Sequence, residues 1–317
     1  MGPARRKPSL PELPEVETVA RGLRSVALGK EIEAVETSGV PSNRLPLTSA
    51  DAAMLVGGRL AAVLRRGKYL VAGVVFDQTV AGPEPLAPSA DAALLDPAAD
   101  LARHGASLAL VIHLGMSGQL RWADATGEPR PPHTHLVITF SAGYELRFVD
   151  PRRFGFASVV PPSSLASRIT ALVGLGPDAM QGGWTIESLA AALHRSRARL
   201  KTVLLDQSVI AGLGNIYTDE ILFRARIRWD RPANSLSLDE VMRLFSAMQE
   251  VIAKAVDLRG STLADAQYRD LFGSPGSFQN HHLAYGRAGL GCHRCGEILQ
   301  AERFGGRTTT FCPTCQL

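Results

Sequence analysis

The chain has 317 residues, 45% of them hydrophobic, which allows two or three domains with real cores and excludes a disordered chain. The net charge of +4 gives a mild indication of an acidic partner such as nucleic acid. No apolar run is long enough to span a membrane, and the basic segment 1–10 has no apolar core after it, so neither a membrane anchor nor a secretory signal is expected.

The first half of the chain has the pattern of a strand-rich domain preceded by one helix. From Pro14 onward, Val16, Val19 and Leu23 recur at helical spacing. Later stretches have strand character, namely 32–37, 58–76, 107–116, 134–140 and 144–150. We therefore expect a two-sheet β-sandwich with flanking helices over residues 11–162, interrupted by an Ala-, Pro- and Asp-rich surface insertion at 77–107.

The patterning becomes helical after this block. Residues 185–207 read as helix with Thr185 as its cap, and 208–227 contain a glycine-punctuated turn followed by a helix. Residues 237–260 carry one apolar stripe that Gly260 closes. The predicted fold class is thus α+β and multidomain, with a helical DNA-binding domain at 163–286 and a third unit at 287–317.

All the cysteines lie in that third unit, as two C-x2-C pairs. Sixteen residues separate Cys295 from Cys312, and Cys292 and Cys315 complete the set. This spacing is typical of a four-cysteine zinc site, and four thiolates leave no open position for catalysis. We therefore expect one structural Zn²⁺ ion in a zinc finger, and cysteines that are not used for disulfides suit a reducing cytoplasm.

A hairpin is predicted between the two cysteine pairs. The stretch 303–311 reads "RFGGRTTTF", which puts Arg307 near a glycine-rich tip. An exposed arginine on a rigid hairpin can contact phosphate, although a solvated surface charge would look the same in the sequence.

Several motifs occur together and in a fixed order: "PELPEVET" at 11–18, "RRGKYL" at 65–70, "HLGMSG" at 113–118, "DPRRFG" at 150–155, "GLGNIY" at 212–217 and then the cysteine finger. Over residues 11–317 this arrangement resembles bacterial formamidopyrimidine-DNA glycosylase, which removes 8-oxoguanine and ring-opened purines. Endonuclease VIII shares the architecture, but it typically has Gly where this chain has Leu13, and it lacks the "HLGMSG" and "DPRRFG" pair in this form.

The resemblance assigns the catalytic chemistry to the start of "PELPE". It makes Pro11 the nucleophile that forms a Schiff base, Glu12 the adjacent acid/base and Glu15 the residue that orients the amine. Without the other motifs, prolines and acids here would indicate an ordinary helix N-terminus. As written, Pro11 has an amide nitrogen that cannot attack. We therefore expect synthesis to begin at Leu10, read as methionine, and residues 1–10 to be missing from the mature protein.

A damaged base must leave the stack before it is cut, and the hole must be filled. The resemblance assigns this filling to Met116, Arg152 and Phe154, whereas a lone Met would otherwise suit core packing. It assigns the grip on the DNA backbone to Lys68, His133, Lys201, Asn215, Tyr217 and Arg307. Lys68 is also the second candidate nucleophile, and the stretch 270–280 resembles the loop that covers the flipped base.

The expected partner is damaged double-stranded DNA, bound by a monomer in the bacterial cytoplasm near the nucleoid. The expected activity is glycosylase with β,δ-lyase action on oxidised purines. Two alternatives stay open: an endonuclease VIII-like enzyme for oxidised pyrimidines, and a catalytically inactive zinc-finger protein that binds DNA damage because its Pro11 is blocked.

Overall fold

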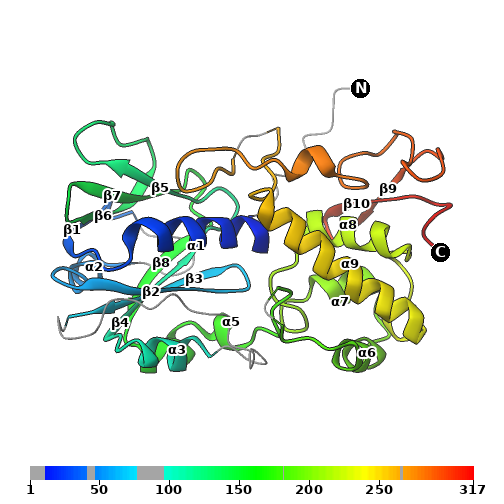
Figure 1. The fold of residues 1–317 in the computed structure, drawn as a ribbon, viewed down its shortest axis with the longest axis horizontal. Coiled ribbons are helices and arrows are strands. Elements are labelled where there is room, and N and C mark those ends of the chain that lie inside the picture. The colour runs from blue at the N-terminus through cyan, green and yellow to red at the C-terminus, as the bar shows by residue number, and fades with distance from the viewer. Residues whose placement is uncertain (1–10, 41–46, 77–95, 181, 265–266) are drawn as a thin grey trace.

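The computed structural model describes residues 11–40, 47–76, 96–180, 182–264 and 267–317. Figure 1 shows a strand-rich half and a helical half side by side, with helix α1 (Leu13–Ala27) running from one into the other. The N-terminal extension 1–10 lies outside the described residues. None of the helices in the described part of the chain is long and apolar enough to cross a membrane.

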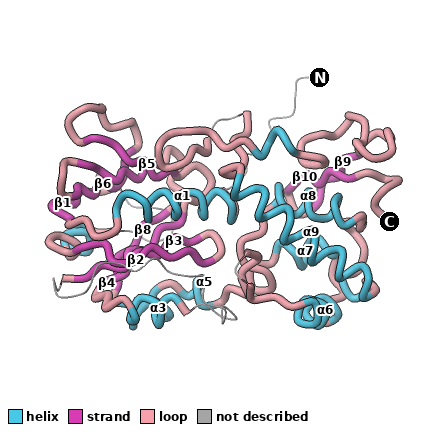
Figure 2. Tube along the Cα trace, in the orientation of Figure 1, coloured by secondary structure: helices cyan, strands magenta, loops and turns pink. Residues whose placement is uncertain are grey.

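The strand-rich half is a sandwich of two four-stranded antiparallel sheets, as expected (Figure 2). One sheet has the order β1 (Ile32–Thr37), β6 (Thr134–Phe140), β7 (Tyr144–Val149), β5 (Gln119–Asp124). The other has the order β2 (Arg59–Arg66), β3 (Tyr69–Val75), β4 (Leu108–His113), β8 (Phe156–Val160). Between the sheets lies an apolar core that includes Leu70, Ile112, Ile138 and Phe148. The strands named from the sequence do not include β5 and β8, which are short: six and five residues.

Helix α1 joins the two halves because its apolar residues serve two different cores. Leu13 packs into the core of the helical half, whereas Val16, Val19 and Leu23 pack against the sandwich. Burying a leucine fully contributes roughly 2 kcal/mol, so α1 holds the halves together as well as completing each of them.

The insertion expected at the surface is only partly a surface feature. Its residues 77–95 lie outside the described part of the chain. Residues Pro97–Arg103 form α3, capped by Asp96, whose side chain accepts from the Ala98 N–H at 2.9 Å. Leu101 is fully buried beside Gly73 of β3, where any side chain would collide with it. The described part of the insertion therefore lies at the surface, but its helix also packs Leu101 onto the outer face of a sheet. Short helices in the same half are α2 (Ser49–Ala53), η1 (Pro162–Ser164), α4 (Leu165–Arg168) and α5 (Thr170–Val173).

The helical half contains α6 (Ile186–His194), α7 (Leu200–Leu205), α8 (Asn215–Ala225), α9 (Leu238–Asp257) and the short turns η2 (Ala233–Ser235) and η3 (Phe278–His281). Thr185 caps α6 as predicted, by accepting from the Ser188 N–H. The single helix expected over 185–207 is instead two. The break at 195–199 is stabilised by backbone hydrogen bonds to another segment: the Leu200 N–H donates to the Arg231 carbonyl, and the Ala233 N–H donates to the Ala198 carbonyl. Backbone groups at the break are therefore paired without a helix.

The last unit is a two-stranded hairpin of β9 (Gln300–Phe304) and β10 (Arg307–Phe311) next to the cysteines. Gly305 and Gly306 form its turn, and both have positive φ, which explains two consecutive glycines there. The hairpin with Arg307 at its tip is thus confirmed.

Candidate active site and nucleic-acid interface

Glu12 is buried where the N-termini of two helices meet. It is the N-cap residue of α1, and its carboxylate accepts the Ile216 N–H at 2.9 Å and the Tyr217 N–H at 3.3 Å from the first turn of α8. Burial raises the pKa of Glu12 to about 7, although the charge of Lys68 and the two N–H groups oppose this. A carboxyl group that titrates near neutral pH can both hold and release a proton, as general acid–base catalysis requires.

Glu15 lies one turn along α1 and is equally buried. Its carboxylate accepts the Glu12 N–H at 2.8 Å, the Ser261 N–H at 2.7 Å and the Tyr217 hydroxyl at 2.5 Å. Burial raises the pKa of Glu15, while these hydrogen bonds act in the other direction. Pro11 immediately precedes the pair and is buried with it. The "PELPE" segment therefore holds two fixed carboxyl groups, on the first and fourth residues after Pro11.

Lys68 faces the same place from the turn between β2 and β3. It is half-buried, and burial lowers its pKa, an effect that Arg307 reinforces and that Glu12 and Glu15 oppose. The mutual influence of these charges shows that the turn, the start of α1 and the finger hairpin converge. Gly67, with φ of +56°, allows the tight turn that presents Lys68.

Arg65 and Arg66, the first two residues of "RRGKYL", fix this turn. Arg65 is fully buried and donates two bonds to Asp178, at 2.7 and 2.9 Å, and one to Glu17 at 2.8 Å. Arg66 donates to the Leu175 and Gly176 carbonyls. These bonds tie the Lys68 turn to the segment entering the helical half. The doubled arginine was the available signal, but its distant partners were not visible in the sequence.

The two loops expected to fill the void in DNA lie against each other. Asp150 accepts the Ser117 hydroxyl at 2.5 Å and the Gly155 N–H at 2.7 Å, so it bonds to both loops. A Cβ on Gly115 would lie 2.4 Å from the backbone of Phe154, which explains the glycine before Met116.

The three side chains expected to fill the void occupy the surface of these loops. Met116 is half-buried, whereas Arg152 and Phe154 are exposed, and the Arg152 guanidinium lies 4.9 Å from the centre of the Phe154 ring. His133 is also exposed, and its carbonyl accepts the Asp150 N–H at 3.0 Å. The structure therefore brings these four predicted residues together at one surface.

Asn215 opens α8 after Gly214, as expected for a phosphate contact at a helix N-terminus. Its side-chain amide donates to the Thr308 carbonyl at 2.9 Å, which joins α8 to β10 of the finger, and its Oδ1 has no partner among the described residues. Asn215 and Arg307 thus lie on adjoining elements.

Tyr217 and Lys201 do not lie at the surface, although the resemblance predicts that both contact the DNA backbone. Tyr217 is fully buried and holds Glu15, so it supports the carboxyl groups and does not face the DNA. Lys201 is also fully buried and forms an ion pair with Asp219, which also accepts the Thr310 N–H at 3.0 Å. This burial favours a structural role for Lys201, linking α7 to α8 and the finger.

The stretch 270–280 is likewise not a free cover over the site. Leu271 is buried in the sandwich core, and its carbonyl accepts the Trp122 N–H at 2.9 Å. Phe272 is exposed beside it. The expectation of a covering loop is therefore wrong for the part around Leu271, which packs as core.

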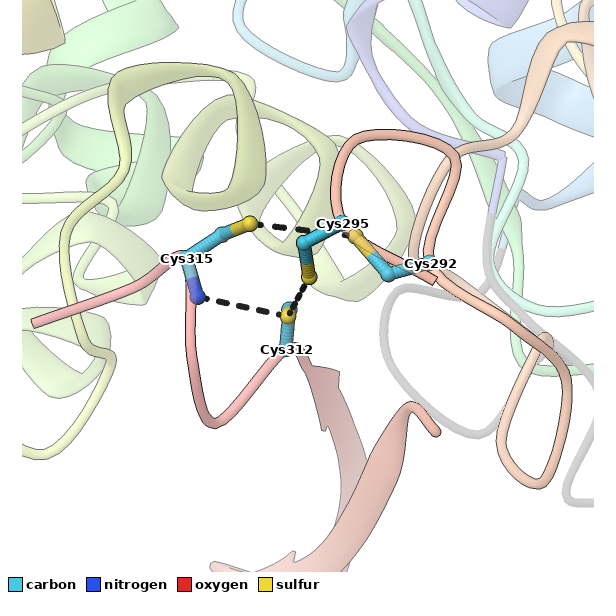
Figure 3. Close-up of side chains that lie close together, drawn as sticks. All are labelled: Cys292, Cys295, Cys312 and Cys315. Carbon is cyan, nitrogen blue, oxygen red and sulfur yellow. Dashed lines mark hydrogen bonds between the residues drawn. The ribbon is translucent and has the colours of Figure 1, made fainter. Parts of the chain in front are cut away.

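The four cysteine sulfurs point toward one another (Figure 3) and lie within 4.8 Å of each other. The Cys292–Cys315 and Cys295–Cys312 Sγ separations are 3.9 and 3.6 Å. A tetrahedral zinc with Zn–S bonds of about 2.3 Å requires sulfurs about 3.8 Å apart, so the cluster fits one structural zinc ion.

The molecule combines a sandwich domain that has two buried carboxyl groups, a helical domain in which a glycine precedes a helix, and a zinc finger. This combination is that of a DNA repair glycosylase of the helix–two-turn–helix class. The chain belongs to the formamidopyrimidine-DNA glycosylase family. Residues 10–157 match the formamidopyrimidine-DNA glycosylase N-terminal domain, residues 175–267 its H2TH domain, and residues 289–317 the zinc finger found in FPG and IleRS.

Individual relatives are similar over nearly the whole chain. Formamidopyrimidine-DNA glycosylase of Thermus thermophilus is 39% identical over 97% of this chain and 98% of its own length, and that of Herpetosiphon aurantiacus is 37% identical over 97% and 100%. The crystal structure of the Thermus thermophilus MutM (Fpg) protein matches with a TM-score of 0.77 at 38% identity, over 96% of this chain and 98% of that one. Lactococcus lactis Fpg bound to DNA containing an abasic site matches with a TM-score of 0.78 at 30% identity, over 96% and 99%.

Proposed function

We propose that this protein excises oxidised purines such as 8-oxoguanine and formamidopyrimidines from duplex DNA and then cleaves the strand by β,δ-elimination. The observation that carries this proposal is the pair of buried carboxyl groups directly after Pro11: those of Glu12 and Glu15, the second of which accepts the Glu12 N–H. The relatives support the substrate class, since they are formamidopyrimidine-DNA glycosylases and one, from Lactococcus lactis, was crystallised with DNA containing Fapy-dG.

The reaction needs an amine that attacks C1′ of the damaged nucleotide. A secondary amine at Pro11 would form a bond to C1′ while the base leaves with the glycosidic electron pair and takes a proton. The C1′–O4′ bond then breaks, O4′ keeps its electron pair and takes the proton that the amine gives up, and a permanently charged iminium forms. When the 2′ proton is lost, the iminium accepts that electron pair as an enamine, and the enamine then expels the phosphate, which leaves with the C–O electron pair. Glu12, whose raised pKa suits proton transfer near pH 7, is the proposed acid/base, and Glu15 holds the Glu12 N–H beside the amine.

This chemistry requires Pro11 to carry a free amine, because an amide nitrogen has its lone pair delocalised into the carbonyl. We infer that the active form begins at Pro11, after initiation at Leu10 and removal of the initiating methionine. The family match that begins at residue 10 supports this inference.

The proposed DNA surface joins three elements. Met116, Arg152 and Phe154 would fill the space left by the flipped base, with Arg152 reading the opposite base. Lys68, His133, Asn215 and Arg307 would contact the backbone. We propose a monomer in the bacterial cytoplasm, since one chain carries the carboxyl groups, the void-filling loops and the finger.

Trapping with borohydride tests the proposal, because reduction of a Schiff base leaves a covalent protein–DNA adduct. Protein beginning at Pro11 should be trapped on duplex containing 8-oxoguanine and should cleave it, whereas uncleaved protein beginning at Met1 should bind without trapping. N-terminal mass analysis of the native protein completes the test. Retention of residues 1–10 together with trapping would contradict the assignment and make Lys68 the next candidate. Preferred excision of thymine glycol over 8-oxoguanine would favour the endonuclease VIII-like alternative. If the proteins beginning at Met1 and at Pro11 both bind damaged DNA but neither is trapped, the catalytically inactive damage-binding protein would be favoured.

A further inference from the structure

His282 is a buried histidine to which the proposed mechanism gives no role. It follows η3, and only 8% of its surface is exposed. Its ring packs edge-on against Phe278 and Tyr285, with centroids 5.6 and 5.5 Å away, and Phe278 packs in turn against Tyr217. The imidazole therefore lies one layer behind the tyrosine that donates to Glu15.

A continuous polar path leads from His282 to the carboxyl group. Its Nε2 lies 3.1 Å from Ser261 Oγ, and that oxygen lies 3.4 Å from the Tyr217 hydroxyl. Ser261 also donates its backbone N–H to Glu15 at 2.7 Å. Two of the three hydrogen bonds that Glu15 accepts therefore come from groups next to the Ser261 hydroxyl.

The protonation of the ring fixes the direction of these bonds. Burial lowers the pKa of His282 to about 4, and the charges of Arg287 and His281 act in the same direction. The backbone of Tyr285 opposes them, as a carbonyl accepting from a ring N–H does. The ring is therefore neutral near pH 7, and we assign its proton to Nδ1, which leaves Nε2, 3.1 Å from Ser261 Oγ, to accept the Ser261 hydroxyl proton.

A leucine would fill this apolar space without desolvating an imidazole, so packing alone does not account for a histidine here. With the Ser261 proton committed to His282, the Tyr217 proton has the Glu15 carboxylate, at 2.5 Å, as its close acceptor. Loss of the imidazole acceptor would release the Ser261 hydroxyl to compete for Tyr217, and the support of Glu15 would loosen.

We propose that His282 is a positioning residue for Glu15, acting by accepting the Ser261 hydroxyl and thereby holding the Ser261 N–H and the Tyr217 hydroxyl on the carboxylate. The inference rests on the proposed function, because it assumes that Glu15 supports the Pro11 nucleophile.

The test uses zinc-loaded protein beginning at Pro11 and measures two quantities: the single-turnover rate of 8-oxoguanine excision and the affinity for duplex holding an uncleavable abasic analogue. His282→Leu should slow excision by about tenfold, the rate equivalent of one neutral hydrogen bond, with little change in affinity. His282→Gln, which keeps an acceptor at the reach of Nε2, should restore most of the rate. The matched control is His281→Leu, an exposed neighbour that should behave as wild type.

A second variant keeps the test decisive if His282→Leu folds poorly. Ser261→Ala should show the same slowing, because it removes the same hydrogen bond from its other side. Excision by His282→Leu at the wild-type rate would overturn the inference while leaving the proposed function intact. Parallel losses of rate, affinity and thermal stability without rescue by Gln would also overturn it. If wild-type protein itself fails to excise, the proposed function fails and the inference fails with it.

Discussion

The backbone N–H of Ile216 donates to the carboxylate of Glu12 at 2.9 Å, across 204 positions of the chain. Glu12 belongs to the helix that completes the sandwich, and Ile216 belongs to the helical half. The proposed acid/base is therefore in place only when the two halves are docked, and the N-terminus of α8 stabilises it with two N–H groups and its dipole. The contact can be tested by replacing Gly214, the glycine before α8, which lies against the Glu12 side chain.

Gly214→Ala should disturb Glu12 and slow catalysis. The backbone there, at φ −136°, accepts alanine, but the new Cβ would lie 2.3 Å from Glu12 Cδ. Displacing the carboxyl group should lower the single-turnover rate by about 100-fold, in the range that general acid–base catalysis contributes. Gly127→Ala is the matched control, because its Cβ would meet nothing closer than 3.7 Å. Equal rates for both variants would show that Glu12 tolerates the shift.

Glu12→Gln should change the pH dependence of stability in a defined direction. The folded-state pKa of Glu12, about 7, lies above its usual 4.5, so its contribution to stability is complete below pH 4.5 and is lost as pH rises through 7. Glutamine does not titrate, so the variant should gain stability relative to wild type between pH 5 and 8, by at most about 3 kcal/mol. Denaturant unfolding at several pH values measures this gain, and a difference that does not vary with pH would contradict the raised pKa.

Features that depend on residues close in sequence could be predicted, but the direction in which individual side chains face was harder to predict. The cysteine spacing, the Thr185 cap and the Gly305–Gly306 turn each depend on residues close in sequence, and the structure has all three. Tyr217 was predicted to contact the DNA backbone, although its position in the helix already indicated otherwise. Residues two apart on a helix point about 200° away from each other, so Tyr217 cannot face the same side as Asn215.

Other features depended on partners that no local pattern reveals. Arg65 meets Asp178 only after the halves have docked, and His282 meets Ser261 only when the segment around η3 folds back onto the end of α9. The helix at 97–103 was hidden because its Ala- and Pro-rich composition matches that of a surface insertion, while Leu101 is its one large apolar residue in the core. Sequence reasoning therefore identified the segments of the site and missed the buried network that supports it.

Asp150→Asn should weaken the void-filling loops without removing any of their exposed side chains. The Ser117 hydroxyl and the Gly155 N–H donate to different oxygens of the carboxylate, and an amide replaces one of these oxygens with an NH2 group, so one donor loses its partner. Excision of an intact lesion should slow by more than cleavage at a preformed abasic site, which no longer requires base extrusion. Ser117→Ala, which removes only one of these bonds, should have a smaller effect. Equal slowing on both substrates would contradict this role.

Cys312→Ser should lose stoichiometric zinc and weaken DNA binding, because three thiolates no longer complete the tetrahedron and the hairpin carrying Arg307 is attached to that cluster. Trapping on abasic DNA at saturating protein should persist, since no cysteine lies among the carboxyl groups. Zinc analysis and titration of damaged duplex check both parts. Chelated protein that binds as tightly as native protein would show that the finger does not contribute.

Lys201→Met separates the buried ion pair from a phosphate contact. If the ammonium serves Asp219, its removal leaves a buried carboxylate without its charge partner and should destabilise the protein by roughly 3–5 kcal/mol. The double variant Lys201→Met, Asp219→Asn removes both charges and should recover part of that stability, which a lysine acting only on DNA would not explain.

A lysine that binds phosphate also contributes to the salt dependence of affinity, so its loss lowers the slope of log K against log salt by about 1. Because Lys201 is fully buried, we expect the slope of the double variant to equal that of wild type, whereas Arg307→Ala should lower it. Denaturant unfolding and DNA titration at several salt concentrations measure both quantities, and a slope reduced in the double variant with wild-type stability would return Lys201 to the DNA surface.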